Sequence, residues 1–317
     1  MIQKVAVVGS GYMGGGIAQV FALAGRDVVI ADVSGEVARA NLDRLVKEAG
    51  DFERDGLFPA GAPGTIAERI SAAETIEQAV AEADFIIEAV FERIDVKHEI
   101  LARISAAARP DAIIDSNTST ISITKLAAAV QGPERFFGVH FSNPAPFIPG
   151  VELIPHDGTD TDLLAPVEEL LTASGKLSAR ISDATGFVLN RLQYALFHEA
   201  TQLVEEGVAS VEAIDTIVRT TFGFRLPFFG PFAIADMAGL DVYRFCYASF
   251  EADFPERFKT PQILQDLIDQ GALGVKSGRG FLNAPPEALP EIIAYRNRAY
   301  VAMAKLLEEL GPAPVTY

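Results

Sequence analysis

The chain has 317 residues, 49% of them hydrophobic, which is enough for two domains that each bury their own core. Its formal charge of −17 opposes binding to nucleic acid or to an anionic membrane surface. No apolar run approaches the ~20 residues that span a bilayer, no basic cleavable leader is visible, and the single cysteine excludes an intrachain disulfide. These features predict a cytoplasmic globular protein.

The N-terminal segment predicts a dinucleotide site. Residues 4–8 are an apolar run typical of a buried strand, and they lead directly into Gly9-Ser10-Gly11-Tyr12-Met13-Gly14, after which apolar residues recur at helical spacing. Gly9 permits a tight turn, Gly11 lets the backbone approach a pyrophosphate, and Gly14 lets the helix pack against the strand. Alone, G-x-G-x-x-G could be a chance loop; the strand before it and the helix after it favour a cofactor site.

Asp32 indicates which dinucleotide is bound. It ends a second apolar run, residues 27–31, 18 residues beyond Gly14, where a carboxylate can accept hydrogen bonds from an adenosine ribose. A 2′-phosphate would meet a like charge there, and residues 33–36 offer no Arg or Lys. The sequence therefore predicts NAD rather than NADP; the alternative is an ordinary solvated Asp.

The first half of the chain continues to alternate helices and strands, which is typical of a doubly wound, mostly parallel Rossmann sheet. Helices are predicted over residues 37–49, 76–83 and 98–108, and strands over 85–90, 112–115, 136–140 and 151–154. Residues 56–64 are rich in Gly and Pro and are predicted to be irregular.

After about residue 182 the pattern is helical only. Helices are predicted over 187–206, 211–220, 234–250 and 291–310, so we expect a Rossmann domain over 1–182 and an all-α domain over 183–317. The helix at 187–206 is apolar nearly all round, which indicates a core helix, a subunit interface or both. Cys246 lies among aromatic residues and is interpreted as a buried packing residue.

His140 is the candidate base. It ends a strand at the side of the sheet where ligands bind, and the next predicted strand carries Glu152. Neighbouring strands can bring the two together, so that the carboxylate fixes the imidazole tautomer while the other ring nitrogen takes an alcohol proton. The alternative is a structural His in a turn. The four histidines are scattered without metal-ligand spacing, so no metal site is predicted.

An ordered set of motifs along essentially the whole chain resembles the L-3-hydroxyacyl-CoA dehydrogenase superfamily. The motifs are residues 9–14, Ser116-Asn117-Thr118-Ser119, residues 140–144, Val151-Glu152, residues 186–191, Gly230-Pro231-Phe232 and residues 276–281. The resemblance implies an NAD-dependent oxidoreductase that acts on a 3-hydroxyl group, and a homodimer formed through the helical domain.

The resemblance also implies roles for individual residues. His140 matches the catalytic base and Glu152 its orienting carboxylate, while Ser119 and Asn190 match residues that hold the reacting oxygen and the substrate. Tyr12, Met13 and Asn117, with Glu92 and Lys97, match positions around the cofactor. Other interpretations stay open: Ser119 could cap the helix near residue 122, Asn190 could be a core amide, and Glu92 and Lys97 could be surface residues of one helix.

Two departures from the acyl-CoA enzymes bear on the substrate. Residues 51–56 carry three acids and one Arg where lysines usually hold CoA phosphates, and Arg225 precedes Gly230-Pro231 in a longer segment. The chain is more similar to the lambda-crystallin (L-gulonate 3-dehydrogenase) and carnitine dehydrogenase branch, so Arg225 could hold a free carboxylate. We expect a small free 3-hydroxy acid as substrate. The alternatives are a short-chain 3-hydroxyacyl-CoA and, more remotely, a crystallin-like or sensor protein that binds NAD without turnover; Arg225 could also be solvated or paired with an acid.

Overall fold

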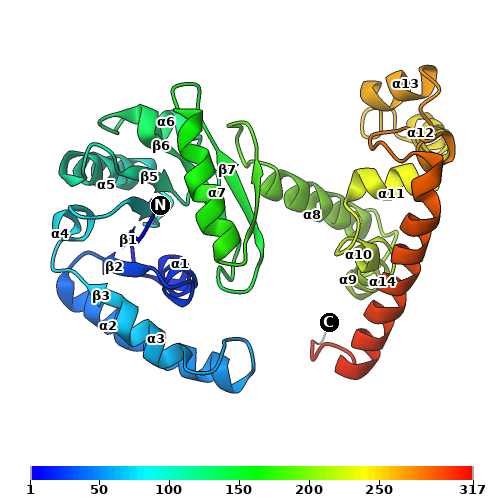
Figure 1. Cartoon of the computed structure of the whole chain (residues 1–317). Coiled ribbons are helices and arrows are strands. Elements are labelled where there is room, and N and C mark those ends of the chain that lie inside the picture. Colours follow the sequence, from blue (N-terminus) through cyan, green and yellow to red (C-terminus); the bar gives the residue numbers. More distant parts are fainter. Residues whose placement is uncertain (1, 316–317) are drawn as a thin grey trace. The chain divides into compact units, whose positions relative to one another are not determined.

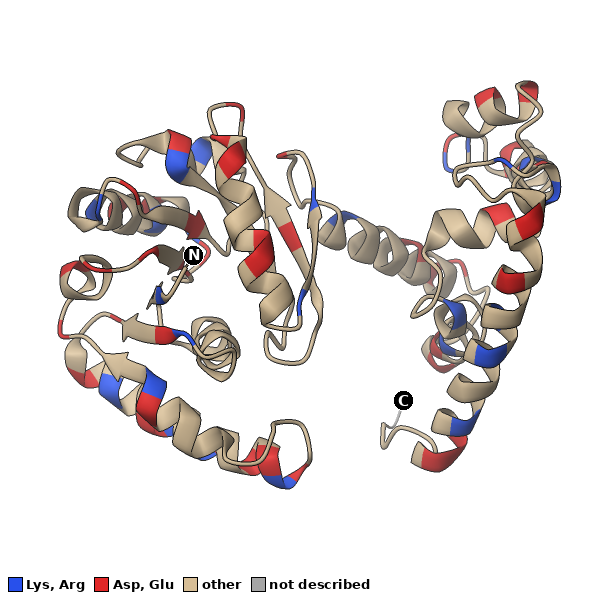
Figure 2. Ribbon diagram, in the orientation of Figure 1, with Lys and Arg blue, Asp and Glu red and all other residues tan. Residues whose placement is uncertain are grey.

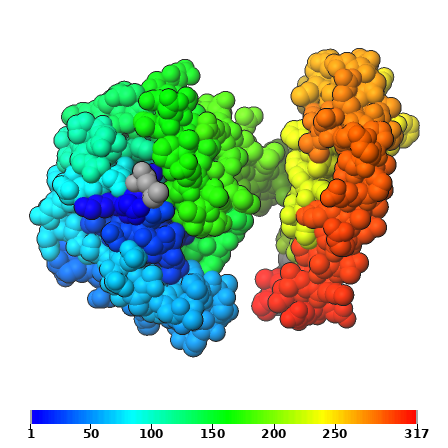
Figure 3. Space-filling view, viewed as in Figure 1, coloured from blue at the N-terminus to red at the C-terminus, as the bar shows by residue number. Residues whose placement is uncertain are grey.

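The computed structural model describes residues 2–315, which form two compact units (Figure 1). The first ends at Leu196 and the second begins at Phe197. In the space-filling view the segments coloured blue to green, which belong to the first unit, pack closely against one another (Figure 3). The division lies inside a helix, so the predicted domain boundary at residue 182 stays a prediction.

The first unit is built on one eight-stranded sheet with the order β3-β2-β1-β4-β5-β6-β7-β8. All neighbouring strands are parallel except β6 and β7, which are antiparallel. This order, with its reversal at β1, is that of a Rossmann fold and confirms the predicted class. The strands are β1 (Lys4–Val8), β2 (Asp27–Ala31), β3 (Ile70–Ala72), β4 (Phe85–Glu88), β5 (Ile113–Ser116), β6 (Phe136–Phe141), β7 (Gly150–Ile154) and β8 (Leu177–Arg180).

Helices cover both faces of this sheet, because the strand side chains that alternate between the two faces are apolar on each. One face packs against α1 (Tyr12–Leu23), α2 (Gly35–Arg54), α3 (Ala62–Arg69) and α7 (Leu164–Ala173). The other packs against α4 (Ile76–Val80), α5 (Ile94–Ala107) and α6 (Ile123–Ala127). The carboxyl ends of the parallel strands therefore meet along one edge.

The Gly/Pro-rich stretch is more regular than predicted. Helix α3 begins at Ala62 and has Pro63 in its first turn, where proline is compatible with a helix, and β3 follows it directly. Helix α5 begins four residues earlier than predicted, at Ile94.

The second unit is all-helical, as predicted. It contains most of α8 (Leu189–Glu205) and then α9 (Val211–Thr220), α10 (Phe222–Arg225), α11 (Pro231–Ala238), α12 (Leu240–Asp253), α13 (Gln262–Asp269) and α14 (Leu289–Leu310). The predicted helix at 234–250 is two helices, broken at Gly239, whose φ of 101° lies outside the helical region.

One burial prediction is wrong for this unit, and one of two alternatives predicted for α8 is not observed. The buried residues of its core cluster are only Ala235, Leu240 and Leu264. This small core covers one face of α12. Cys246, which was predicted to be buried, lies beside that face and is exposed. No described residue of α8 is buried, so α8 is not a core helix.

Candidate active site

The glycine turn between β1 and α1 has the geometry that a dinucleotide requires. Gly9 has a φ of 96°, and a Cβ there would lie 2.6 Å from the carbonyl oxygen of Ala89. A Cβ at Gly14 would lie 1.8 Å from the carbonyl oxygen of Gly9, whereas one at Gly11 would meet nothing within 4 Å. The open side at Gly11 and the first N–H groups of α1 fit a pyrophosphate. Tyr12 is exposed at this turn, and Met13 packs against the core.

Asp32 follows β2 and is bound to the same turn. Its Oδ2 accepts hydrogen bonds from the Ser10 N–H (2.8 Å) and from Ser10 Oγ (2.7 Å), and its Oδ1 accepts one from the Val33 N–H (2.8 Å). The carboxylate is only partly buried, so lone pairs are left for ribose hydroxyl groups. The residues present therefore fit NAD.

His140 and Glu152 lie directly opposite each other on the antiparallel strands β6 and β7. Nδ1 of His140 is 2.7 Å from Oε2 of Glu152, and the imidazole is only 4% exposed. Burial alone would raise the pKa of Glu152, but hydrogen bonds from His140 and from two backbone N–H groups outweigh it, so this pKa lies below its usual value. An ionised carboxylate makes Nδ1 the protonated nitrogen and leaves Nε2 as an acceptor.

The second oxygen of Glu152 is held by the start of α8. Oε1 accepts hydrogen bonds from the N–H groups of Val188 and Leu189, both at 2.9 Å. The preceding Gly186 and Phe187 have φ values of 77° and 50°, the left-handed region that a bulky side chain seldom adopts. This strained turn also buries the Phe187 ring, 5.7 Å from the His140 ring, so it covers the imidazole while it fixes the carboxylate.

The other predicted substrate residues come together at the end of β5. Nδ2 of Asn190, on α8, donates to the carbonyl oxygen of Ser119 (2.8 Å), and Asn190 is half-buried rather than a core amide. Asn117 Oδ1 accepts the Phe141 N–H (2.8 Å), next to the base. Within residues 2–315 the Ser119 hydroxyl has no hydrogen-bond partner, so it is available to a ligand.

The interpretation of Ser119 as a helix cap is wrong. Helix α6 begins at Ile123, and the carboxylate of Asp183 accepts its first N–H groups, those of Ile123 (3.0 Å) and Thr124 (2.8 Å). Asp183 also accepts the hydroxyl group of Ser122 (2.7 Å). It thereby ties the segment between β8 and α8 to the sheet.

Lys97 is not a surface residue. Its side chain is 1% exposed, and Nζ lies 2.8 and 3.0 Å from the two oxygens of the buried Glu88 and 3.4 Å from Glu92. Oε1 of Glu92 in turn accepts the N–H groups of Ser119 (2.8 Å) and Thr120 (2.9 Å). Burial opposes ionisation of Glu92, but these bonds and the Lys97 charge hold its pKa below the usual value. The network links α5 to the loop that carries Ser119.

Arg225 lies at the end of α10 in the second unit. Its side chain is half-buried, and no residue of the described chain forms an ion pair with its guanidinium. Burial raises the pKa of Tyr243, and the charge of Arg225 only partly opposes this. The alternative in which a nearby acid neutralises Arg225 is not observed in this structure.

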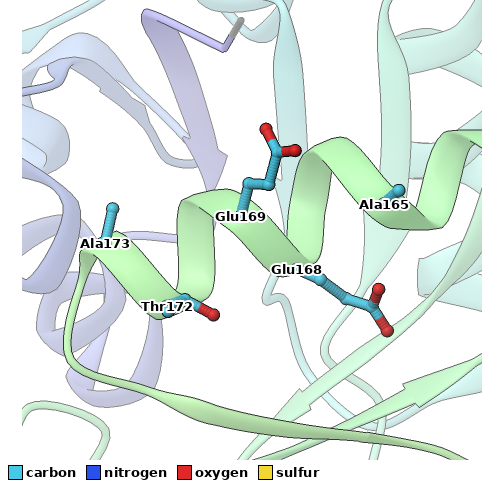
Figure 4. A pocket seen from close by; sticks show the side chains of 5 residues that line it. All are labelled: Ala165, Glu168, Glu169, Thr172 and Ala173. Carbon is cyan, nitrogen blue, oxygen red and sulfur yellow. The ribbon is translucent and has the colours of Figure 1, made fainter.

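One surface hollow lies away from these residues. It runs along α7, where Glu168 and Glu169 project in different directions, and is lined by Ala165, Glu168, Glu169, Thr172 and Ala173 (Figure 4). Arg180 neutralises Glu168 through contacts of 2.6 Å, and the hollow holds none of the predicted site residues. Among the described residues no cluster of metal ligands is found, and none of the described helices could cross a bilayer.

Sequence reasoning missed three contributors to the site. Phe187 was assigned to a helix, Glu88 to a strand, and Ser10 to a variable position of the glycine motif. A charged residue such as Glu88 inside an apolar strand was the one available signal, because buried acids need partners.

Comparisons with known proteins agree with this geometry. The model of the 3-hydroxyacyl-CoA dehydrogenase NAD binding domain matches residues 4–184, and that of the 3-hydroxyacyl-CoA dehydrogenase C-terminal domain matches residues 186–284. A 5-formyl-3-hydroxy-2-methylpyridine 4-carboxylate 5-dehydrogenase of Mesorhizobium japonicum is 36% identical over 97% of this chain and 99% of its own length. A 3-hydroxybutyryl-CoA dehydrogenase of Bradyrhizobium diazoefficiens is 36% identical over 89% and 95%. The crystal structure of a 3-hydroxyacyl-CoA dehydrogenase from Archaeoglobus fulgidus has a TM-score of 0.79 and 32% identity, over 98% of this chain and 99% of that one.

Proposed function

Because this chain belongs to the 3-hydroxyacyl-CoA dehydrogenase family and is an NAD-dependent oxidoreductase, we propose that it oxidises the 3-hydroxyl group of a small free 3-hydroxy carboxylate to the 3-keto product. The half-buried Arg225 guanidinium, unpaired within the described chain, is the observation that carries the choice of a free acid.

Proton transfer is the task of the strand pair β6–β7. Nε2 of His140 accepts the proton of the substrate hydroxyl, and the imidazolium that forms keeps its Nδ1–H on Glu152. The Glu152 carboxylate stabilises that positive charge and cannot turn away, because its other oxygen is held by Val188 and Leu189. When bound, NAD accepts the hydride that leaves the same carbon.

The reacting oxygen is held from the other side of the site. We assign its hydrogen bond to the Ser119 hydroxyl, since the backbone of Ser119 is fixed by Glu92 and by Asn190. Because two anchors already hold Ser119, its hydroxyl group loses less conformational entropy when the substrate binds. Asn190 is assigned the orientation of the substrate from the first turn of α8.

The charge distribution on α2 supports a free acid over a CoA thioester. At the C-terminal end of α2 the single cation, Arg54, is paired with Asp51, and the carboxylate of Glu53 accepts the Gly61 N–H (3.0 Å). Figure 2 shows acidic and basic residues side by side along this helix. A polyanionic CoA would find no free cation on residues 51–64, whereas a single carboxylate needs only one guanidinium. The relative from Mesorhizobium japonicum, whose name specifies a carboxylate substrate, adds support.

A substrate panel tests the proposal. NADH formation is measured with free 3-hydroxy acids beside their CoA thioesters, for the wild type and for Arg225→Met, with Arg219→Met on α9 as the exposed control. We expect turnover of a free acid, and for Arg225→Met a KM raised about tenfold or more, since a charge-assisted bidentate pair contributes about 1.5–3 kcal/mol. Turnover of thioesters alone, with a KM indifferent to Arg225, would identify a short-chain acyl-CoA dehydrogenase instead.

The same panel addresses the remote alternative of an NAD-binding protein without turnover. Stoichiometric NAD binding with no NADH formed from any compound would favour that alternative. His140→Gln is expected to abolish turnover and to leave NAD affinity near the wild-type value. Full activity in this variant would refute the assignment of the base.

We further propose that the chain forms a homodimer through the helical domain. The exposed fractions of Leu192, Tyr194 and Phe197 on α8 are 59, 64 and 63%, more apolar surface than one helix usually leaves in water. Size-exclusion chromatography with light scattering is expected to give twice the chain mass of 33.9 kDa. Phe197→Asp should shift the protein toward the monomer; a wild type that is monomeric at micromolar concentration excludes the dimer.

A further inference from the structure

Arg44, on α2, reaches the glycine turn from the neighbouring helix. Its Nη2 donates to the carbonyl oxygens of Ser10 (3.1 Å) and Gly11 (3.3 Å). Its Nη1 donates to both carboxylate oxygens of Glu48, at 2.8 and 3.0 Å, one turn further along the helix. The planar guanidinium is therefore fixed between a carboxylate and the phosphate-binding turn.

Gly15, which lies just outside G-x-G-x-x-G, provides the space for this approach. A Cβ at Gly15 would lie 3.1 Å from Nη2 of Arg44 and 2.8 Å from Cδ2 of Leu45. Either contact would push α2 away from the turn. The absence of a side chain at Gly15 and the reach of Arg44 are thus two parts of one arrangement.

The hydrogen bonds from Arg44 help to fix where the backbone N–H groups of the turn point, together with the Gly15 N–H, which donates to the Gly11 carbonyl at 2.8 Å. In a trans peptide the carbonyl group and the next N–H point in opposite directions. Since the carbonyls of Ser10 and Gly11 face Arg44, the N–H groups of Gly11 and Tyr12 face away from α2. The open space beside Gly11 lies at this turn, and Ser10 is also fixed by its bonds to Asp32.

We propose that Arg44 is a positioning residue for the NAD pyrophosphate. It orients the Ser10–Gly11 and Gly11–Tyr12 peptides so that their N–H groups are preorganised for phosphate oxygens, and it does not touch the cofactor. Glu48 neutralises its charge, so its effect comes from orientation and not from a long-range field. The role concerns the cofactor and is independent of which substrate is oxidised.

The first test compares Arg44→Met with the wild type by titration with NADH, followed by nucleotide fluorescence. We expect the Kd to rise about tenfold, in keeping with the strength of charge-assisted hydrogen bonds. The KM for NAD should rise in parallel, while kcat at saturating NAD and the KM for the hydroxy substrate stay unchanged. Arg103→Met, which breaks the exposed pair with Glu77, is the matched control and should bind NADH normally.

Glu48→Gln provides a second test that leaves the Arg44 charge in place. If Arg44 acts by orientation, loss of its anchor weakens NADH binding by about two- to threefold, because a neutral acceptor holds a guanidinium less firmly than a carboxylate. Tighter or unchanged binding would overturn the proposal, since it would mean that charge alone matters or that the anchor does nothing. The proposal also fails if Arg44→Met binds NADH normally. It fails as well if kcat, the KM for both substrates and the thermal midpoint of Arg44→Met all worsen together, because that result would indicate a general loss of structure.

Discussion

Asp115, on β5, should make the stability of the first unit depend on pH. Its side chain is fully buried, and neither carboxyl oxygen has a hydrogen-bond partner among the described residues. Burial raises its pKa well above the usual value, the nearby Glu88 carboxylate raises it further, and Lys97 only partly opposes this. Asp115 is thus protonated in the folded chain at pH values where the unfolded chain has lost that proton.

The sign and size of the effect follow from linkage. An unfolded Asp has a pKa of about 3.9, so above that pH the folded state binds more protons and the free energy of unfolding falls as the pH rises. The slope is about 1.4 kcal/mol per pH unit until the pH reaches the folded pKa. The stabilising contribution is fully present below the unfolded pKa and is lost as the pH increases. Asn, which has the same shape and does not titrate, removes this dependence.

Urea unfolding followed by far-ultraviolet circular dichroism measures the effect. Above the unfolded pKa, Asp115→Asn should gain up to about 1.4 kcal/mol per pH unit on the wild type, since the other groups titrate in both proteins. Asp157→Asn, which removes an exposed carboxylate from a turn, is the control and should show a constant difference. A constant difference for Asp115→Asn as well would refute the inference of a buried neutral acid.

Three further substitutions test the site, and a fourth, Gly64→Ala, is a control. Glu152→Gln should lower kcat at least about a hundredfold with little change in NADH affinity. A base without its carboxylate loses much of the roughly 10²–10⁴-fold rate enhancement that proton transfer contributes. Steady-state kinetics and NADH titration check this. Gly14→Ala should abolish NADH binding, because its Cβ would lie 1.8 Å from the carbonyl oxygen of Gly9. Gly64→Ala replaces an exposed glycine of α3 with open space around it, and it should raise stability by up to about 1 kcal/mol, as measured by thermal melts. Lys97→Met should cost about 3–5 kcal/mol in urea unfolding, because Glu88 stays buried without its cation; a loss below about 1 kcal/mol would contradict the buried pairing.

The Rossmann half could be predicted from sequence because its signals are local. The glycine turn, the strand that ends at Asp32 and the short apolar runs each depend on neighbouring residues. The approach of His140 to Glu152 was also predictable, since a short connection between adjacent strands brings their residues face to face.

The features that were not predicted depend on contacts between distant parts of the chain. The capping of Glu152 by α8 requires a positive φ at Phe187, which no propensity of phenylalanine suggests. The exposure of Cys246 and of α8 depends on how small the core of the second unit is, and an apolar helix pattern cannot distinguish an internal core from a face that awaits another subunit.

The His140–Glu152 pair depends on two parts of the chain. The sheet supplies the imidazole and the carboxylate, but the donors that stop the carboxylate from rotating come from the chain after the last strand. A fragment cut after Arg180 would keep every strand and the whole nucleotide turn while its acid lost two of its partners. Such a fragment would keep the turn proposed to bind the nucleotide and would lose the restraint proposed to hold Glu152 beside His140.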